Sequence, residues 1–193
     1  MTIVSAASLE MTPSVEGTAY VSLESFLADY SEVEDGMKYE WNDGVIEITE
    51  SMNQEQLKIQ DILLRLFVQT KFFKLGHTFT AETDMFTSVK QLRRPDLAIY
   101  TKEQIEAAAE GENQIALWVA EIISNSDNLK RTDLKIDEYF DAGVQVVWQI
   151  MPFSKKVYVF TSPEDLKVCR GETICSAAPA LDDFEIKAAD LFA

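Results

Sequence analysis

Histidine and cysteine are scarce in this chain of 193 residues, which has one histidine and two cysteines. A structural zinc site usually takes four such ligands, so the chain does not supply the usual set. Cys169 and Cys175 flank a predicted turn and could lie near each other, but nothing indicates an oxidising compartment, so a disulfide is the less favoured reading. His77 has no Gly-x-Ser-x-Gly partner for serine hydrolase chemistry, and a glycine-rich phosphate loop is also missing.

Long apolar runs are absent as well. No stretch approaches the roughly 20 residues that a membrane helix needs. The first residues, Met-Thr-Ile-Val-Ser-Ala, lack the basic segment and long apolar segment of a secretory signal. Apolar residues still make up 47% of the chain, which is typical of a globular core. We therefore expect a cytoplasmic protein without a membrane span.

Basic residues are few, and the net charge is -16. Residues 1–50 hold 11 acids and one base, whereas residues 51–160 hold 15 acids and 13 bases. Overall acidity argues against strong nonspecific binding to DNA. The nearly neutral middle of the chain weakens that objection.

Hydrophobic periodicity and turn residues divide the chain into alternating elements. Residues 1–19 are small and polar, which predicts a loose N-terminal arm before a single domain of residues 20–193. The predicted helices cover residues 21–30 with Ser22 as the N-cap, 53–73 as one long helix ended by Gly76, 102–111 and 127–143. The predicted strands cover residues 77–89, 96–100, 115–123, 144–152 and 155–162, with hairpins at 37–49 and 165–177. This order favours a mixed α/β domain with a central sheet flanked by helices, an N-terminal hairpin and additional C-terminal strands.

Two acids stand out because each lies at the start of, or inside, a strand whose other residues are apolar and predicted to be buried. Asp96 follows Pro95 at the start of one strand, and Glu121 lies inside the apolar run of residues 115–123. A buried carboxylate is costly unless it is paired or coordinates a metal. Two carboxylates at adjacent strand ends could hold one Mg²⁺. The alternative is that Asp96 caps a turn after Pro95 while Glu121 pairs with an arginine, such as Arg93, Arg94 or Arg131, or with a lysine.

Several segments resemble the Uma2 family of restriction-endonuclease-like proteins. The matching segments are Tyr-Glu-Trp-Asn-Asp-Gly-Val-Ile, Arg-Arg-Pro-Asp-Leu-Ala-Ile-Tyr, Ala-Glu-Ile-Ile-Ser-Asn-Ser and the long stretch from Asp133 to Ile150, within residues 36–193. The resemblance implies the PD-(D/E)xK nuclease fold and a metal-dependent phosphodiesterase site.

Carried over residue by residue, the resemblance makes Asp96 and Glu121 the acids of the site. Ile123 stands where the usual lysine would be, and Lys135 on the following helix takes that role, stabilising charge on the phosphate or orienting the attacking water. Ile122 could offer its carbonyl oxygen to the metal.

Two further positions, Glu40 and Gln56, are supporting residues by the same resemblance. Glu40 matches a hairpin glutamate, although an exposed strand residue remains an equal reading. Gln56 stands where relatives often carry a histidine, and Arg131 stands where they often carry an acid.

Basic residues gather around the two acids in sequence. Arg93 and Arg94 precede the first acid, and Lys130 and Arg131 follow the second. We expect these four to contact the phosphate backbone of DNA, although a solvated helix face is the alternative. Spacing of four residues places Arg131, Lys135 and Tyr139 in one polar row, and the row of Ile136 and Phe140 should pack on the sheet. We expect a polar surface position for Lys135, so that its removal hardly changes stability.

These patterns lead to two hypotheses. One is a DNA endonuclease that depends on Mg²⁺ or Mn²⁺. The other is a catalytically inactive module that binds DNA or protein on the same fold. We also expect a homodimer, with residues 144–152 and 155–160 supplying a strand edge around Trp148.

Overall fold

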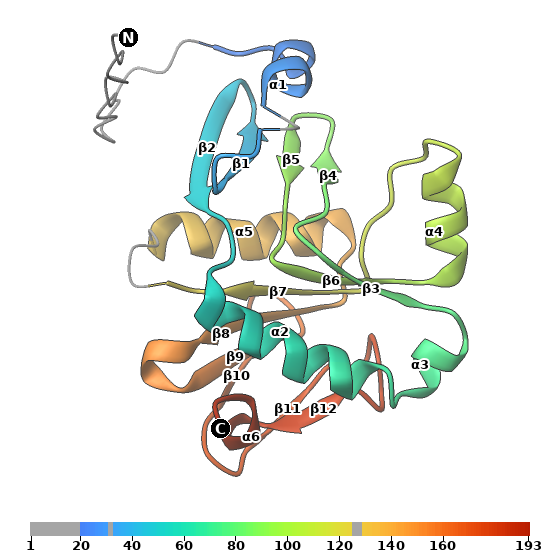
Figure 1. Cartoon of the computed structure of the whole chain (residues 1–193), viewed down its shortest axis with the longest axis vertical. Coiled ribbons are helices and arrows are strands. Elements are labelled where there is room, and N and C mark those ends of the chain that lie inside the picture. The colour runs from blue at the N-terminus through green and yellow to red at the C-terminus, as the bar shows by residue number, and fades with distance from the viewer. Residues whose placement is uncertain (1–19, 31–32, 125–128) are drawn as a thin grey trace, which may run out of the picture.

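The computed structural model describes residues 20–30, 33–124 and 129–193. The predicted arm of residues 1–19 lies outside this part of the chain, as do the side chains of Glu55, Leu129 and Lys130. Figure 1 shows a small sheet at one end, helix α5 beneath it, a larger sheet across the middle and helix α2 on the far side of that sheet.

The larger sheet has six strands in the order β10-β9-β8-β7-β6-β3. Its strands are β3 (Thr78–Ala81), β6 (Leu97–Tyr100), β7 (Trp118–Ile122), β8 (Val146–Met151), β9 (Lys156–Phe160) and β10 (Leu166–Cys169). Only β7 and β8 run parallel, and α5 (Leu129–Ala142) makes the crossover between them that a parallel pair requires. The other neighbouring pairs are antiparallel, so the predicted mixed central sheet is confirmed.

Successive side chains of a strand point to opposite faces of the larger sheet, and a different helix covers each face. In β7, Trp118 and Ala120 join the core on the face covered by α2 (Gln54–Phe67), together with Leu63. Val119, between them, joins the core beneath α5. Because the period of a strand is two residues, Glu121 also faces α5, and this places its carboxylate under the small sheet.

The smaller sheet has four strands in the order β2-β1-β5-β4. They are β1 (Met37–Asn42), β2 (Val45–Glu50), β4 (Met85–Ser88) and β5 (Gln91–Arg93). Asp43 and Gly44 both have positive φ angles, which gives the predicted hairpin its two-residue turn. Helix α1 (Leu23–Asp29) begins at Ser22, whose side chain accepts a hydrogen bond from the Ser25 amide, as predicted.

Two predicted elements are each divided in the structure. The long helix ends at Phe67, and a separate helix α3 (Lys71–Lys74) starts at Thr70, because the Thr70 hydroxyl caps the Phe73 amide. The strand predicted at residues 77–89 is wrong as a single unit. It breaks near Glu82, a residue with positive φ, and its two halves pair in different sheets.

The C-terminal region also differs from the prediction. The two strands within residues 165–177 do not form a hairpin, since β10 pairs with β9, and β11 (Ile174–Ser176) pairs with β12 (Glu185–Lys187). Cys169 and Cys175 are buried free thiols, as the sequence favoured. Helix α4 (Lys102–Ala109), helix α6 (Ala188–Leu191) and a short 3₁₀ turn (Pro152–Ser154) complete the described part of the chain. No helix within it has the length and apolarity that crossing a membrane requires.

Candidate functional site

A pocket of about 380 Å³ opens where the hairpin of the small sheet meets the larger sheet. Its walls come from β1, β2, the start of α2, the C-terminal end of β7 and the first turns of α5. Charged and polar side chains of the wall include Lys38, Glu50, Gln56, Asp96, Glu121, Arg131 and Lys135. The predicted catalytic residues therefore meet at one place.

Asp96 is held at the entrance to β6 by both of its oxygens. Its Oδ2 accepts a hydrogen bond of 2.7 Å from the Ile122 amide of the neighbouring strand. Its Oδ1 lies 2.5 Å from Nζ of Lys38. The residue is 6% exposed, so it is a buried and paired carboxylate and does not act as the simple turn cap of the alternative reading.

Glu121 is also buried and lies among cations and a hydroxyl. Tyr139 donates its hydroxyl to Oε1, and Nζ of Lys135 lies 3.4 Å from the same oxygen. Oε2 lies 3.8 Å from Nζ of Lys38. Among the described residues, neither oxygen pairs with an arginine, so a partnership with Arg93, Arg94 or Arg131 is wrong. The pairing with lysine that the alternative also allowed is present. Burial raises the pKa of Glu121, although Lys135 and Lys38 offset part of that effect.

Lys38 is the residue that the sequence did not reveal. It lies on β1, is 4% exposed and places one ammonium between the two acids. Burial alone would lower the pKa of Lys38, but the carboxylates of Asp96, Glu121 and Glu40 outweigh burial and raise it. A charged lysine therefore occupies the position between the carboxylates.

Glu40 and Lys135 form a second ion pair behind the first. Glu40 is 0% exposed, so it is not the exposed strand residue of the alternative reading. Its Oε1 lies 2.8 Å from Nζ of Lys135 and accepts the Arg94 amide at 3.0 Å. Although burial opposes ionisation, Lys135, Lys38 and Arg93 lower the pKa of Glu40.

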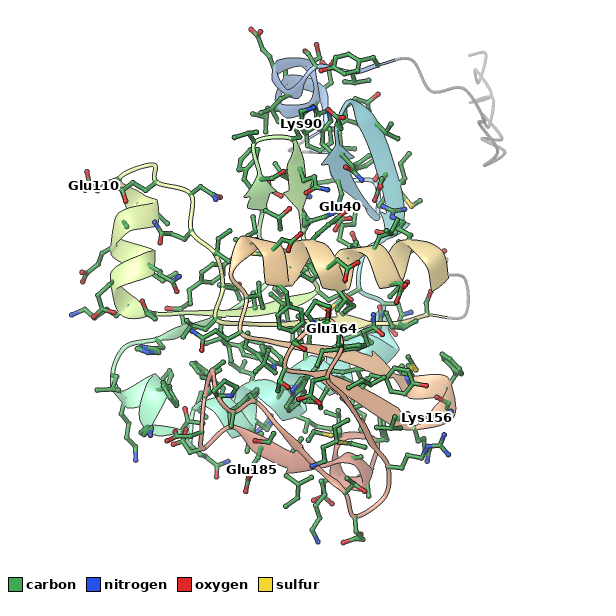
Figure 2. All side chains as sticks on the ribbon, turned by 180° about the vertical axis from the view of Figure 1, so that it is seen from behind. Glu40, Lys90, Glu110, Lys156, Glu164 and Glu185 are labelled. Carbon is green, nitrogen blue, oxygen red and sulfur yellow. The ribbon has the colours of Figure 1, made fainter. Side chains whose placement is uncertain are left out.

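Lys135 does not lie on a polar surface as predicted. It is 6% exposed, because the row of Arg131, Lys135 and Tyr139 turns toward the acids under the small sheet, namely Glu47, Glu40 and Glu121. Ile136 packs on the larger sheet, as predicted, and Phe140 packs beside it. Figure 2 labels Glu40 in the layer between the small sheet and α5, where this row meets it.

Ile122 and Gln56 form the remaining edge of the site. The Ile122 carbonyl oxygen accepts a hydrogen bond of 3.0 Å from Nε2 of Gln56. A carbonyl oxygen has two lone pairs, and both residues line the pocket, so the Ile122 carbonyl lies at its edge.

The four bases expected on DNA have different surroundings. Arg93 is 1% exposed and binds Glu40, Glu47 and Glu138, so the prediction that it contacts DNA is wrong. Arg94 pairs with Asp84 at 2.6 Å and keeps a partly exposed side chain. Arg131 pairs with Glu47 and lines the pocket. The side chain of Lys130 lies outside the described residues.

A family model described as "Putative restriction endonuclease", Uma2, matches residues 23–189. The chain belongs to the Uma2 family. A solved structure from Anabaena variabilis, described as a "putative nuclease belonging to DUF820", matches this Uma2 chain with a TM-score of 0.75 and 18% identity. The match covers 89% of this chain and 97% of that chain. No curated protein matches the sequence.

These comparisons confirm the predicted family and the predicted fold. At 18% identity, the Anabaena structure supports the fold alone, and the chemistry of the site depends on the residues described above.

Proposed function

We propose that this Uma2 protein is a nuclease that hydrolyses DNA phosphodiester bonds and uses Mg²⁺ or Mn²⁺ held by Asp96 and Glu121. One observation carries the proposal. A single ammonium, that of Lys38, lies 2.5 Å from Asp96 and 3.8 Å from Glu121 at the wall of an open pocket. The two carboxylates are therefore close enough to share one cation.

The donor set suits a hard divalent cation. Within the described residues, no group of three or more histidine, cysteine, aspartate or glutamate side chains could hold a metal ion. Two carboxylates and the Ile122 carbonyl are available, and Mg²⁺ commonly binds through one or two carboxylates with waters completing its shell. When bound, such a cation lowers the pKa of a water and offsets charge on the phosphate.

The chain's own residues would position the reacting groups. The Tyr139 hydroxyl and the Lys135 ammonium hold Oε1 of Glu121, whereas Oε2 lies on the side of the Lys38 ammonium. An ammonium has three N–H donors, and Lys135 uses two of them on Glu40 and Glu121. Its third donor is available for a phosphate oxygen that enters the pocket.

DNA as the substrate is supported by the family description and by two arginines near the acids, of which Arg131 lines the pocket. Arg131 is 25% exposed and Arg94 is 16% exposed in their side chains, so each is partly accessible. Each also has an acidic partner, which would compete with phosphate and make binding sensitive to salt. The cytoplasmic location and the Mg²⁺ or Mn²⁺ cofactor remain parts of this proposal.

A homodimer also remains a prediction, but the expected edge is wrong. Trp148 is 0% exposed, and β8 has hydrogen-bonded neighbours on both sides. The outer strands of the larger sheet are β10 and β3. Of these, β10 presents the exposed side chains of Leu166 and Val168, and it is the better candidate for a contact between copies.

The second hypothesis, an inactive binding module on this fold, is favoured by the same ammonium. Lys38 and Lys135 pair with Asp96 and Glu121 without a metal, so the acids already have cationic partners. Activity separates the two hypotheses.

The direct test incubates supercoiled plasmid with the protein in Mg²⁺, in Mn²⁺ and in a chelator. We expect nicked or linear product with either metal and none with chelator or with Asp96→Asn. The matched control is Asp182→Asn, which changes an exposed aspartate paired with Lys71 away from the pocket and should cut like the parent. A parent that leaves the plasmid intact with both metals would favour the binding module.

A further inference from the structure

Lys38 has a position that differs from that of every other lysine described in the structure. Its ammonium lies between Asp96 and Glu121, the two acids that would hold a metal, whereas Lys135 lies between Glu121 and Glu40. Lys38 is 4% exposed and lines the pocket. The position that a shared cation would need is therefore filled by the chain itself.

Removal of this ammonium without replacement would be unfavourable. Asp96 and Glu121 are 6% and 5% exposed, and buried like charges that lose their counter-ion repel each other. A divalent cation between them would meet the Lys38 ammonium at short range, and two cations at that distance also repel. The acids can therefore keep either the lysine or the metal in this position, and not both.

The side chain gives the ammonium a route out. Lysine carries a compact charge on a flexible four-carbon stem. The pocket of about 380 Å³ lies beside the ammonium and has room for it after displacement. Its walls also include Glu50, an exposed acid on the strand paired with β1.

We propose that Lys38 is the resident cation of this site and that a divalent metal enters by exchange with its ammonium. This inference rests on the proposed metal-binding function of the same acids. It deepens that function, because the affinity for metal is then set by a lysine that coordinates nothing. The lysine stabilises the metal-free fold and weakens metal binding.

The test compares Mn²⁺ binding by calorimetry in the full chain and three lysine variants. Lys38→Met should bind Mn²⁺ at least about tenfold more tightly than the parent, because no ammonium has to leave. Lys135→Met removes the same charge from the same cluster but leaves Lys38 in place, so its gain should stay below about threefold. Lys71→Met, at an exposed lysine paired with Asp182, should match the parent.

Each outcome has a definite meaning. Tighter binding in Lys38→Met than in a parent that also binds Mn²⁺, without an equal gain in Lys135→Met, supports exchange. Binding in Lys38→Met with none in the parent overturns it, because the metal then does not displace the lysine. Equal affinity in the parent and Lys38→Met, together with metal-dependent cutting by the parent, overturns the exchange and leaves the proposed function standing. Equal gains in Lys38→Met and Lys135→Met also overturn it, since general charge would then explain both. Absence of binding in every form overturns both proposals.

A measurement on the parent covers the case in which Lys38→Met does not fold. In the ¹H–¹⁵N spectrum of lysine ammonium groups, two buried and paired lysines should give slowly exchanging signals without metal. Saturation with Mg²⁺ should remove the protection of one signal and keep the other. Persistence of both signals in the metal-bound protein would overturn the exchange.

Discussion

Two clusters of buried charge lie side by side under the small sheet, and Glu40 belongs to both. In one cluster, the Arg93 guanidinium binds Glu138 through two nitrogens at 2.6 and 2.9 Å, Glu47 at 2.6 Å and Glu40 at 3.2 Å. In the other, the Lys38 ammonium has one contact of 2.5 Å with Asp96 and a longer one of 3.8 Å with Glu121.

The difference follows from the two kinds of base. A guanidinium is a rigid fork that saturates several carboxylates at once, whereas an ammonium is a point charge on a flexible stem. The ion pairs of the Arg93 cluster therefore connect β1, β2 and β5 to α5 and stabilise their packing. The Lys38 cluster lies against an open pocket, where a cation can be exchanged. In the sequence, both clusters are only acids and bases. The structure distinguishes them, because the Arg93 cluster joins elements of the fold and the Lys38 cluster lies beside the pocket.

Arg93→Met should give the largest effect and would break the first cluster. It leaves Glu40, Glu47 and Glu138 without their shared cation, and loss of one partner of a buried ion pair costs about 3–5 kcal/mol. We expect the free energy of unfolding to fall by this amount, as measured by urea titration. A loss below about 1 kcal/mol would contradict the assignment of Arg93 to the scaffold.

Lys135→Ala comes next, and the structure changes the effect on stability that we expected for this residue from its position in the sequence. Because Lys135 is buried against Glu40 and Glu121, its removal should cost about 1–3 kcal/mol, the usual penalty for a buried polar group that loses its partner. Cleavage should also drop by orders of magnitude. Urea titration measures the stability and a plasmid assay measures the cleavage. A variant as stable as the parent would support the earlier prediction that Lys135 lies on the surface.

Glu121→Gln should have a smaller effect on the metal-free fold, within about 1 kcal/mol, because burial opposes the charge on this acid. The same variant should lose all stabilisation by Mn²⁺, since stabilisation by mass action requires binding. Melting curves with and without Mn²⁺ measure both quantities. A large loss of stability, beside a parent that does not respond to metal, would count against the nuclease site.

The pH dependence of that variant sharpens the comparison further. The pKa of Glu121 is raised above its ordinary value of 4.5, so the folded chain holds this proton more tightly than the unfolded chain. Its contribution to stability is therefore present at low pH and is lost as pH rises above about 4.5. Relative to Glu121→Gln, the parent should lose stability over this range, and a constant difference would argue against the raised pKa.

The smallest effect should come from the exposed pair of Arg65 and Asp61 on α2, whose side chains are 75% and 54% exposed. Arg65→Met should leave the urea midpoint unchanged, because solvent screens such pairs. This variant is the matched control for Arg93→Met. A shift comparable to that of Arg93→Met would remove the distinction between buried and exposed arginines.

Much of the fold follows from local patterns in the sequence. The turn at Asp43 and Gly44 and the apolar run of β7 are short-range signals, and each appears in the structure as predicted. The misplaced elements depend on long-range pairing. Nothing local shows that β3 and β4 enter different sheets, or that β10 pairs with β9 and not with β11.

The sequence predicts that Asp96 and Glu121 belong to the site, but it does not predict Lys38. Asp96 and Glu121 stand out because a carboxylate is unusual beside a buried strand. Lys38 and Glu40 occupy alternate positions of β1, so they share one face, and such a face normally reads as solvent-exposed. Here α5 and the larger sheet cover that face, while Tyr39 and Trp41 pack on the other side in the core with Phe26. Burial on both faces is a tertiary property that the pattern of one strand cannot show.

The most direct test of the account is the position of one ion. Crystals of the protein soaked with Mn²⁺ should show a single anomalous peak within coordination distance of both Asp96 and Glu121, with the Lys38 ammonium moved away from Asp96. A crystal without that peak, in which Lys38 still lies between the two acids at high Mn²⁺ concentration, would contradict the claim that these carboxylates form a metal site.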